Sequence, residues 1–88
     1  MANTKSAEKR TRQNAKRYAR NRWYRGRART FIKRARRYMD AGDSESAEIA
    51  VRQACRALDV AAQKNSIHAN NASRRKSRLM KALNRMGE

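Results

Sequence analysis

The stretch "YRGRARTFIKRARRYMDAGDSE", from Tyr24 to Glu45, decides the fold of this chain. Steps of three and four residues separate its apolar side chains, and this spacing places them on one face of an α-helix. These apolar residues are Tyr24, Ala28, Phe31, Ile32, Ala35, Tyr38 and Met39. A polar, glycine-containing segment follows them directly. The stretch therefore predicts one amphipathic helix, a short turn and the start of a second helix.

The polar segment "DAGDSE" contains the signals for ending one helix and beginning the next. Gly42 can take the left-handed conformation that closes a helix C-terminus. Either Asp43 or Ser44 can cap the following helix, and Glu45 and Glu48 place negative charge near its first turn, where it is favourable.

The second helix is expected to run to about Lys64. Its main apolar stripe consists of Ala47, Ala50, Val51, Ala54, Leu58 and Ala61. Ile49 and Val60 lie off that stripe, as expected for a helix that touches two neighbours. The small side chains would let those neighbours approach closely.

A third helix is expected from about Ile67 to Arg85, after a turn "KNS" in which Asn65 can adopt the left-handed conformation. Its inner face consists of Ala72, Leu79, Leu83 and Met86. The chain has no proline, and its strand signals are weak. With short connections, these elements predict an all-α fold, an up-down-up three-helix bundle that forms a single domain over residues 1–88.

The first helix is expected to extend past this bundle. From Lys5 to Met39 it would be about 50 Å long, but its apolar stripe stops near Tyr24 and gives way to Asn21 and Arg17. Residues 1–22 therefore form a basic extension with no core to bury. An Arg-rich start is also typical of mitochondrial transit peptides, although the unbroken helical pattern favours a structural helix.

The composition restricts the classes of partner. The 88 residues carry 24 Lys and Arg against 7 Asp and Glu, which gives a net charge of +17. Nucleic acid is the first candidate for such a cation and an anionic membrane surface the second. No apolar run approaches the ~20 residues that span a bilayer. The single cysteine excludes an internal disulfide and favours a reducing, intracellular compartment.

The charge is unevenly distributed along the chain. Residues 1–38 hold 15 basic residues and 1 acidic residue, residues 39–63 hold 2 and 5, and residues 64–88 hold 7 and 1. The first and third helices should therefore form the basic surface, with the second helix behind them.

The third helix carries one continuous polar and basic stripe, spaced by three and four residues: Asn71, Arg74, Arg78, Lys81 and Arg85. No acidic residues accompany the stripe to form pairs along the helix, so polyanion binding is favoured over an ordinary solvated face.

Basic residues surround most of the first helix: Arg20, Arg22, Arg25, Arg27, Arg29, Lys33, Arg34, Arg36 and Arg37. Nearly all are Arg, which favours bidentate phosphate contacts and stacking. Trp23 lies off the apolar stripe, where it could stack on Arg27, insert against a partner or pack against the third helix.

No pattern in the chain supports catalysis, a cofactor or a small-molecule substrate. There is no Gly-rich phosphate loop, and one Cys with one His cannot supply the four ligands typical of a zinc site. Cys55 is interpreted as a small packing residue. His68 could pack at the edge of the bundle with a local hydrogen bond, contact a phosphate or ribose, or, as the least favoured reading, act in catalysis or metal ligation.

RNA is favoured over DNA as the partner, because the chain has no zinc finger, no leucine-zipper heptad and no clear recognition helix. A long basic helix cannot enter the deep major groove of an RNA duplex but can bridge phosphates of several RNA segments. Two alternatives come from other classes: a basic protein that compacts chromosomal DNA, and a membrane-active amphipathic peptide. The scarcity of large apolar residues argues against the second.

Several motifs resemble one known family over nearly the whole chain: "MANTKSAEKR" at Met1–Arg10, "RNR" at Arg20–Arg22, "RARTFIKRAR" at Arg27–Arg36 and "LDVAAQKNSIHANNASRRKSRLMKAL" at Leu58–Leu83. They resemble the small-subunit ribosomal protein S-twenty family of bacteria and organelles. The resemblance implies a structural component of the small ribosomal subunit that binds 16S-type ribosomal RNA directly, at the 5′ domain and the long penultimate helix, and supports subunit assembly. It also implies a cytoplasmic ribosome, with an organellar ribosome as the alternative.

Matching motifs imply these RNA contacts: Lys5, Lys9, Arg10, Arg17, Arg22, Arg29, Asn70, Arg74, Lys76, Ser77 and Arg78. The basic faces of the first and third helices add Arg20, Arg27, Asn71 and Lys81 to the predicted RNA-binding set.

Overall fold

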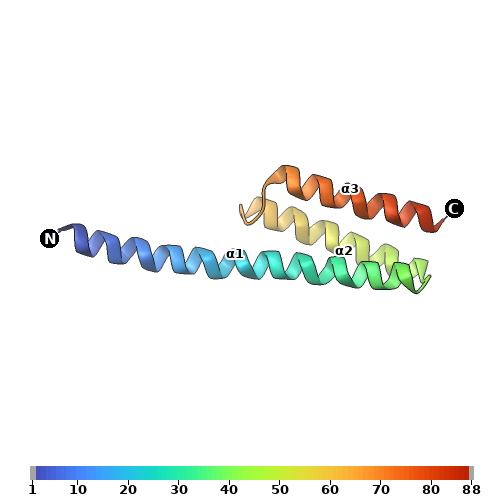
Figure 1. Cartoon of the computed structure of the whole chain (residues 1–88), viewed down its shortest axis with the longest axis horizontal. Coiled ribbons are helices and arrows are strands. Elements are labelled where there is room, and N and C mark those ends of the chain that lie inside the picture. Colours follow the sequence, from blue (N-terminus) through green and yellow to red (C-terminus); the bar gives the residue numbers. More distant parts are fainter. Residues whose placement is uncertain (1, 88) are drawn as a thin grey trace.

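A computed structural model describes residues 2–87, which form helices α1 (Ala2–Asp40), α2 (Ser44–Gln63) and α3 (Ala69–Met86) and contain no strand (Figure 1). The predicted all-α class is therefore confirmed. The largest dimension of the molecule, 66 Å, follows α1, whose 39 residues alone span about 58 Å.

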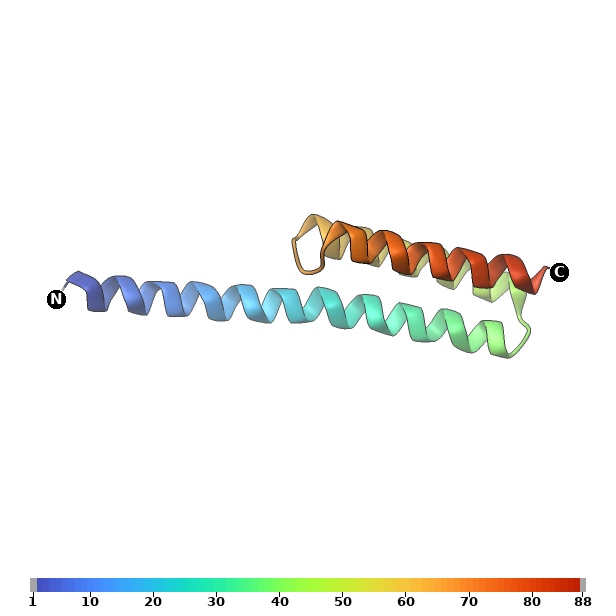
Figure 2. The same ribbon diagram turned by 45° about the horizontal axis from the view of Figure 1, so that its top comes forward.

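The three helices run up, down and up, as predicted, but they do not close evenly around a centre. α2 folds back along the C-terminal half of α1, and α3 folds back along α2 (Figures 1 and 2). α2 contacts both other helices extensively, whereas α1 and α3 barely touch. The N-terminal half of α1 projects past the turn between α2 and α3 with no helix beside it.

The core is narrow and rich in alanine, which brings α2 close to its neighbours. Its buried members are Ala28 and Ala35 of α1, Ala50, Val51, Ala54, Ala57 and Leu58 of α2, and Ala72 and Leu79 of α3. Phe31, Ile32, Tyr38, Met39 and Leu83 pack around them, half-buried. The apolar stripes predicted for the three helices are thus the faces that meet.

One prediction for α2 is wrong in part. Ile49 is not buried against a second neighbour, since 60% of its surface is exposed, and Val60 is half-buried. Ala57 is buried instead. Ala57 follows Ala50 and Ala54 by seven and three residues, so it shares their side of the helix, whereas Ile49 faces outward.

Both turns use the left-handed residues that were expected. Gly42 has φ 76° and Asn65 has φ 59°. Asp43, rather than Ser44, caps α2: its Oδ1 accepts a hydrogen bond from the backbone N–H of Ser46 at 3.1 Å. This bond lowers the pKa of the Asp43 carboxyl below its ordinary value of 3.8, because it stabilises the ionised form.

A hydrogen bond marks the place where α1 leaves the bundle. Ser66 Oγ, in the turn between α2 and α3, donates to Asn21 Oδ1 at 3.1 Å. Every described side chain of α1 before Asn21, from Lys5 to Arg20, is exposed. The side chains of residues 5–20 are therefore exposed beyond the bundle, and the bond from Ser66 joins the end of this segment to the turn between α2 and α3.

Candidate nucleic-acid interface

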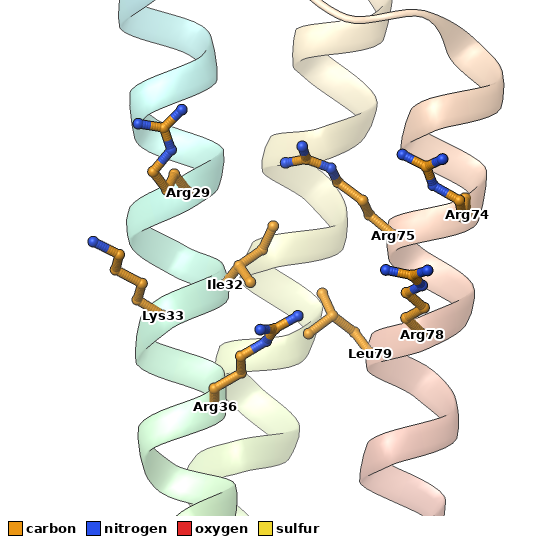
Figure 3. A pocket seen from close by; sticks show the side chains of 8 residues that line it. All are labelled: Arg29, Ile32, Lys33, Arg36, Arg74, Arg75, Arg78 and Leu79. Carbon is orange, nitrogen blue, oxygen red and sulfur yellow. The ribbon is translucent and has the colours of Figure 1, made fainter.

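A cationic groove runs between α1 and α3, which barely touch each other (Figure 3). α1 supplies Arg29, Lys33 and Arg36, and α3 supplies Arg74, Arg75 and Arg78. Ile32 and Leu79 form an apolar floor, and the groove has a volume of about 340 Å³. We call these eight residues the α1–α3 groove; none of them is acidic.

The local sequence explains why cations line this groove. Arg29 and Arg36 lie three residues before and four after Ile32, and Arg75 lies four before Leu79. Side chains at these spacings are neighbours on a helix surface. Each Arg can therefore cover apolar surface with its methylene stem while its guanidinium stays in solvent. In Figure 3 the guanidinium groups of Arg36 and Arg75 point into the space between the helices.

The structure brings together only some of the predicted RNA contacts. Arg29, Arg74 and Arg78 share the groove. The predicted contacts on the extension are exposed and distant from it along α1: Lys5, Lys9, Arg10, Arg17 and Arg20. Asn70, Ser77 and Lys81 are exposed on α3, whereas Asn71 is half-buried.

Lys76 forms an ion pair with a residue of α2. Its Nζ lies 2.7 Å from Asp59 Oδ1 of α2, and this hydrogen-bonded pairing raises the pKa of the Lys76 ammonium. The ion pair links α3 to α2 at a partly exposed position.

Lys33, Arg36 and Arg75 were not among the predicted contacts, although they line the groove. Arg25 and Arg75 also flank a small cavity beside Ile67, which continues the row of cations toward the turn between α2 and α3. The spacing of Arg36 from Ile32 and of Arg75 from Leu79 was visible in the sequence. The signal was missed because it matters only once two helices are known to face each other.

His68 is neither packed nor part of α3, and two sequence-based expectations about it are wrong. α3 begins at Ala69 rather than at Ile67. His68 is the exposed N-cap residue, whose Nδ1 accepts a hydrogen bond from the Asn70 N–H at 3.0 Å. The expected local hydrogen bond is present, but the ring does not contact the core.

Cys55 behaves as the predicted packing residue, since it lies half-buried against the core. Burial raises the pKa of its thiol, which disfavours the reactive thiolate.

No cluster of three or more potential metal ligands occurs within residues 2–87. Over the same residues, no helix is both long and apolar enough to cross a membrane.

Trp23 does not pack against α3, and that alternative is wrong. Its ring is 59% exposed. The Arg27 guanidinium lies 5.6 Å from the ring centroid, as the stacking alternative predicted. Trp23 lies about 120° around the axis of α1 from Arg29, which lines the α1–α3 groove.

An all-helical chain with a cationic groove and a bare cationic helix is typical of basic structural proteins that bind nucleic acid. Residues 2–84 match the model of the family described as "Ribosomal protein S20". The chain belongs to this family, and the resemblance seen in its motifs is confirmed.

Similar chains carry the description "Small ribosomal subunit protein bS20". The protein of Thermomicrobium roseum is 55% identical over 84 residues, which cover 96% of this chain and 85% of the relative. The protein of a Roseiflexus species is 59% identical over 81 residues, covering 92% and 88%. That of Geobacter sulfurreducens is 48% identical over 87 residues, covering 99% and 100%. These are ribosomal proteins without enzymatic activity, as predicted for this chain.

Proposed function

We propose that this chain is a structural component of the small ribosomal subunit that binds ribosomal RNA and supports subunit assembly. Family membership supports the place in the subunit. The observation that carries RNA binding is the α1–α3 groove, in which six cations from two helices surround an apolar floor without an acidic partner. Like charges held this close repel each other until an anion lies between them.

RNA phosphates are the anions that fit this arrangement. Five of the six cations are Arg, whose guanidinium can hold a phosphate in a bidentate manner. We include the sequence-predicted contacts of both helices: Lys5, Lys9, Arg10, Arg17, Arg20, Arg22, Arg27, Arg29, Asn70, Asn71, Arg74, Ser77, Arg78 and Lys81. Lys33, Arg36 and Arg75 join them from the groove, and Lys76, which pairs with Asp59 at a partly exposed position, remains in the set.

The proposed work of the molecule is charge neutralisation between RNA segments. A phosphate chain along the groove and a second one along the extension would be held by a single continuous helix, α1. RNA helices that otherwise repel each other could then lie side by side. The RNA regions implied by the family resemblance are the 5′ domain and the long penultimate helix. We treat residues 1–88 as one domain, with residues 1–22 as its basic extension.

The relatives described above are bacterial, which favours a bacterial ribosome, and hence the cytoplasm, over an organellar one. Co-sedimentation of the chain with small ribosomal subunits in a lysate tests this assignment. A chain that stays with the nucleoid DNA fraction would contradict it.

The salt dependence of RNA binding tests the electrostatic mechanism. If the chain neutralises about eight phosphates, log affinity for a small-subunit RNA fragment should fall with log salt with a slope of roughly −6 to −7. A slope near zero would contradict phosphate neutralisation. Competition by duplex DNA as strong as that by ribosomal RNA would favour a DNA-compacting protein instead.

A pair of matched double variants tests the groove itself. Arg29→Ala with Arg78→Ala removes one groove cation from each helix and should reduce the magnitude of the slope by about 1.5. Arg52→Ala with Arg56→Ala removes the same charge from the exposed side of α2, away from the groove, and should leave the slope unchanged. Equal effects of the two doubles would rule out the groove as the contact surface.

A further inference from the structure

Trp23 occupies a place that the packing of the helices does not explain. It lies on α1 just before the first buried core residue, Ala28, and it is 59% exposed. An exposed indole is a large apolar surface left in water, and its aromatic and cation–π contacts are with Tyr24 and Arg27 of α1. Its contacts are with its own helix.

Those contacts hold the ring in one place. Tyr24 meets it edge to face, with centroids 4.9 Å apart and an interplanar angle of 83°. The Arg27 guanidinium sits between two rings, 5.6 Å from Trp23 and 5.5 Å from Phe31. Arg34 lies 5.5 Å from Phe31, so cations and rings alternate along this flank of α1. These contacts favour the observed orientation of the ring.

The surroundings of the ring leave room for a flat ligand. Trp23 lines a shallow surface hollow with Ala19, Arg22, Gly26 and Arg27. Ala19 is small, and a Cβ built on Gly26 would meet nothing within 4 Å. Neither Ala19 nor Gly26 therefore covers the ring, and Arg27 is the neighbour one turn away that lies over it.

The charge around the hollow selects the ligand. Arg22 and Arg27 flank the ring, and Glu8 is the only acidic residue among the first 38. An aromatic face between Arg side chains suits a nucleobase whose neighbouring phosphates reach the guanidinium groups. A protein partner would need a contiguous apolar patch, and on this flank the Arg27 guanidinium lies between the two rings, Trp23 and Phe31.

We propose that Trp23 is a stacking platform for an unpaired base of the bound RNA, with Arg22 and Arg27 holding the adjacent phosphates. The base must be unpaired, because the face of a base inside a duplex is already stacked. This inference rests on the proposed function, since it presumes an RNA partner. It adds a contact with a base to an interface that otherwise binds phosphates.

Trp23 is the only tryptophan of the chain, so its fluorescence reports on this site alone. Three probes are added to the full-length protein: a short single-stranded RNA, the same strand annealed to its complement, and inorganic polyphosphate. Stacking predicts strong quenching by the single strand and weak quenching by the duplex and by polyphosphate, each at saturation. Quenching by polyphosphate equal to that by the single strand would overturn the proposal, because polyphosphate has no base.

Three variants test the site through their affinities for the single-stranded RNA. Trp23→Leu should weaken binding of the single strand by about 5- to 150-fold, the loss expected for one stacked base, and leave duplex binding unchanged. Trp23→Phe, which keeps an aromatic face, should remain within roughly threefold of the parent. Tyr18→Leu removes another exposed ring of α1 and serves as the control. Circular dichroism verifies that all three variants keep the parent helicity.

The possible failures are distinguishable. If Trp23→Leu binds single strands as the parent does, while ribosomal RNA binding keeps its steep salt dependence, the stacking site is wrong and the proposed function survives. If no RNA binds with a steep salt dependence, the proposed function itself fails.

Discussion

The two halves of α1 differ in what surrounds them, although they form one unbroken helix. In residues 21–40, the packed half, Ala28 and Ala35 are buried against α2. In residues 5–20 of the extension, every side chain is exposed, and seven Lys and Arg accompany a single Glu. The packed half contributes buried side chains to the core, whereas residues 5–20 contribute exposed, mainly basic side chains.

This difference shows that a sequence with high helix propensity does not by itself form a stable helix. Most helical stability in proteins comes from packing of an apolar face, and an isolated segment of this length is marginal in water. Repulsion among the cations of the extension weakens it further. The extension should therefore gain its stability from a polyanion, whereas the packed half already has it from α2.

The largest expected effect comes from emptying the core beside the packed half. Leu58 is fully buried in α2, and Leu58→Ala should lower the free energy of unfolding by about 2–5 kcal/mol. Tyr18→Ala in the extension, where the ring is 64% exposed, should change it by less than about 0.5 kcal/mol. Urea denaturation measures both, and equal losses would show that the extension belongs to the cooperative core.

A smaller change is expected where the two halves join. Gly26→Ala adds a Cβ that meets nothing within 4 Å, so it should stabilise the packed half by about 1 kcal/mol. Ala15→Gly makes the opposite change in the extension and should leave the urea midpoint unchanged. A comparable shift in midpoint for Ala15→Gly would contradict the separation of the two halves.

The smallest effect depends on pH and concerns the turn that follows the packed half. The pKa of the Asp43 carboxyl is lowered by its hydrogen bond to Ser46. Its stabilisation is therefore complete above the ordinary value of 3.8 and is lost as the pH falls through the lower folded value. Thermal unfolding midpoints of the parent should drop slightly over that range.

Asp43→Asn is the matched control for this titration. Asparagine also caps helices well but carries no titrating carboxyl, so the part of the acid-induced drop that belongs to Asp43 should disappear in the variant. Identical pH profiles for variant and parent would show that the cap does not depend on the ionised carboxylate.

Local features of the fold were predictable from the sequence because neighbours along the chain determine them. Gly42 and Asn65 were identified as left-handed turn residues, and the apolar stripe of α1 correctly located the packed half. The start of α3 was placed too early, because His68 is an unusual N-cap residue beside the preferred Ser, Thr, Asp and Asn.

The groove was beyond the reach of sequence reasoning for a different reason. Periodicity shows which residues share a face of one helix, but it does not show that α2 holds α1 and α3 apart. Arg75 therefore looked like one more cation in a basic run, and the ion pair of Lys76 with Asp59 was not expected. Trp23 could not be placed until the position of α3 was known.

Amide hydrogen exchange with and without a small-subunit ribosomal RNA fragment tests the central claim most directly. We expect the amides of residues 5–20 to exchange rapidly in the free protein and to become protected when RNA binds, while those of Ala28–Ala35 are protected in both states. An extension that is as protected as the packed half before RNA is added, or that stays unprotected in the complex, would contradict it.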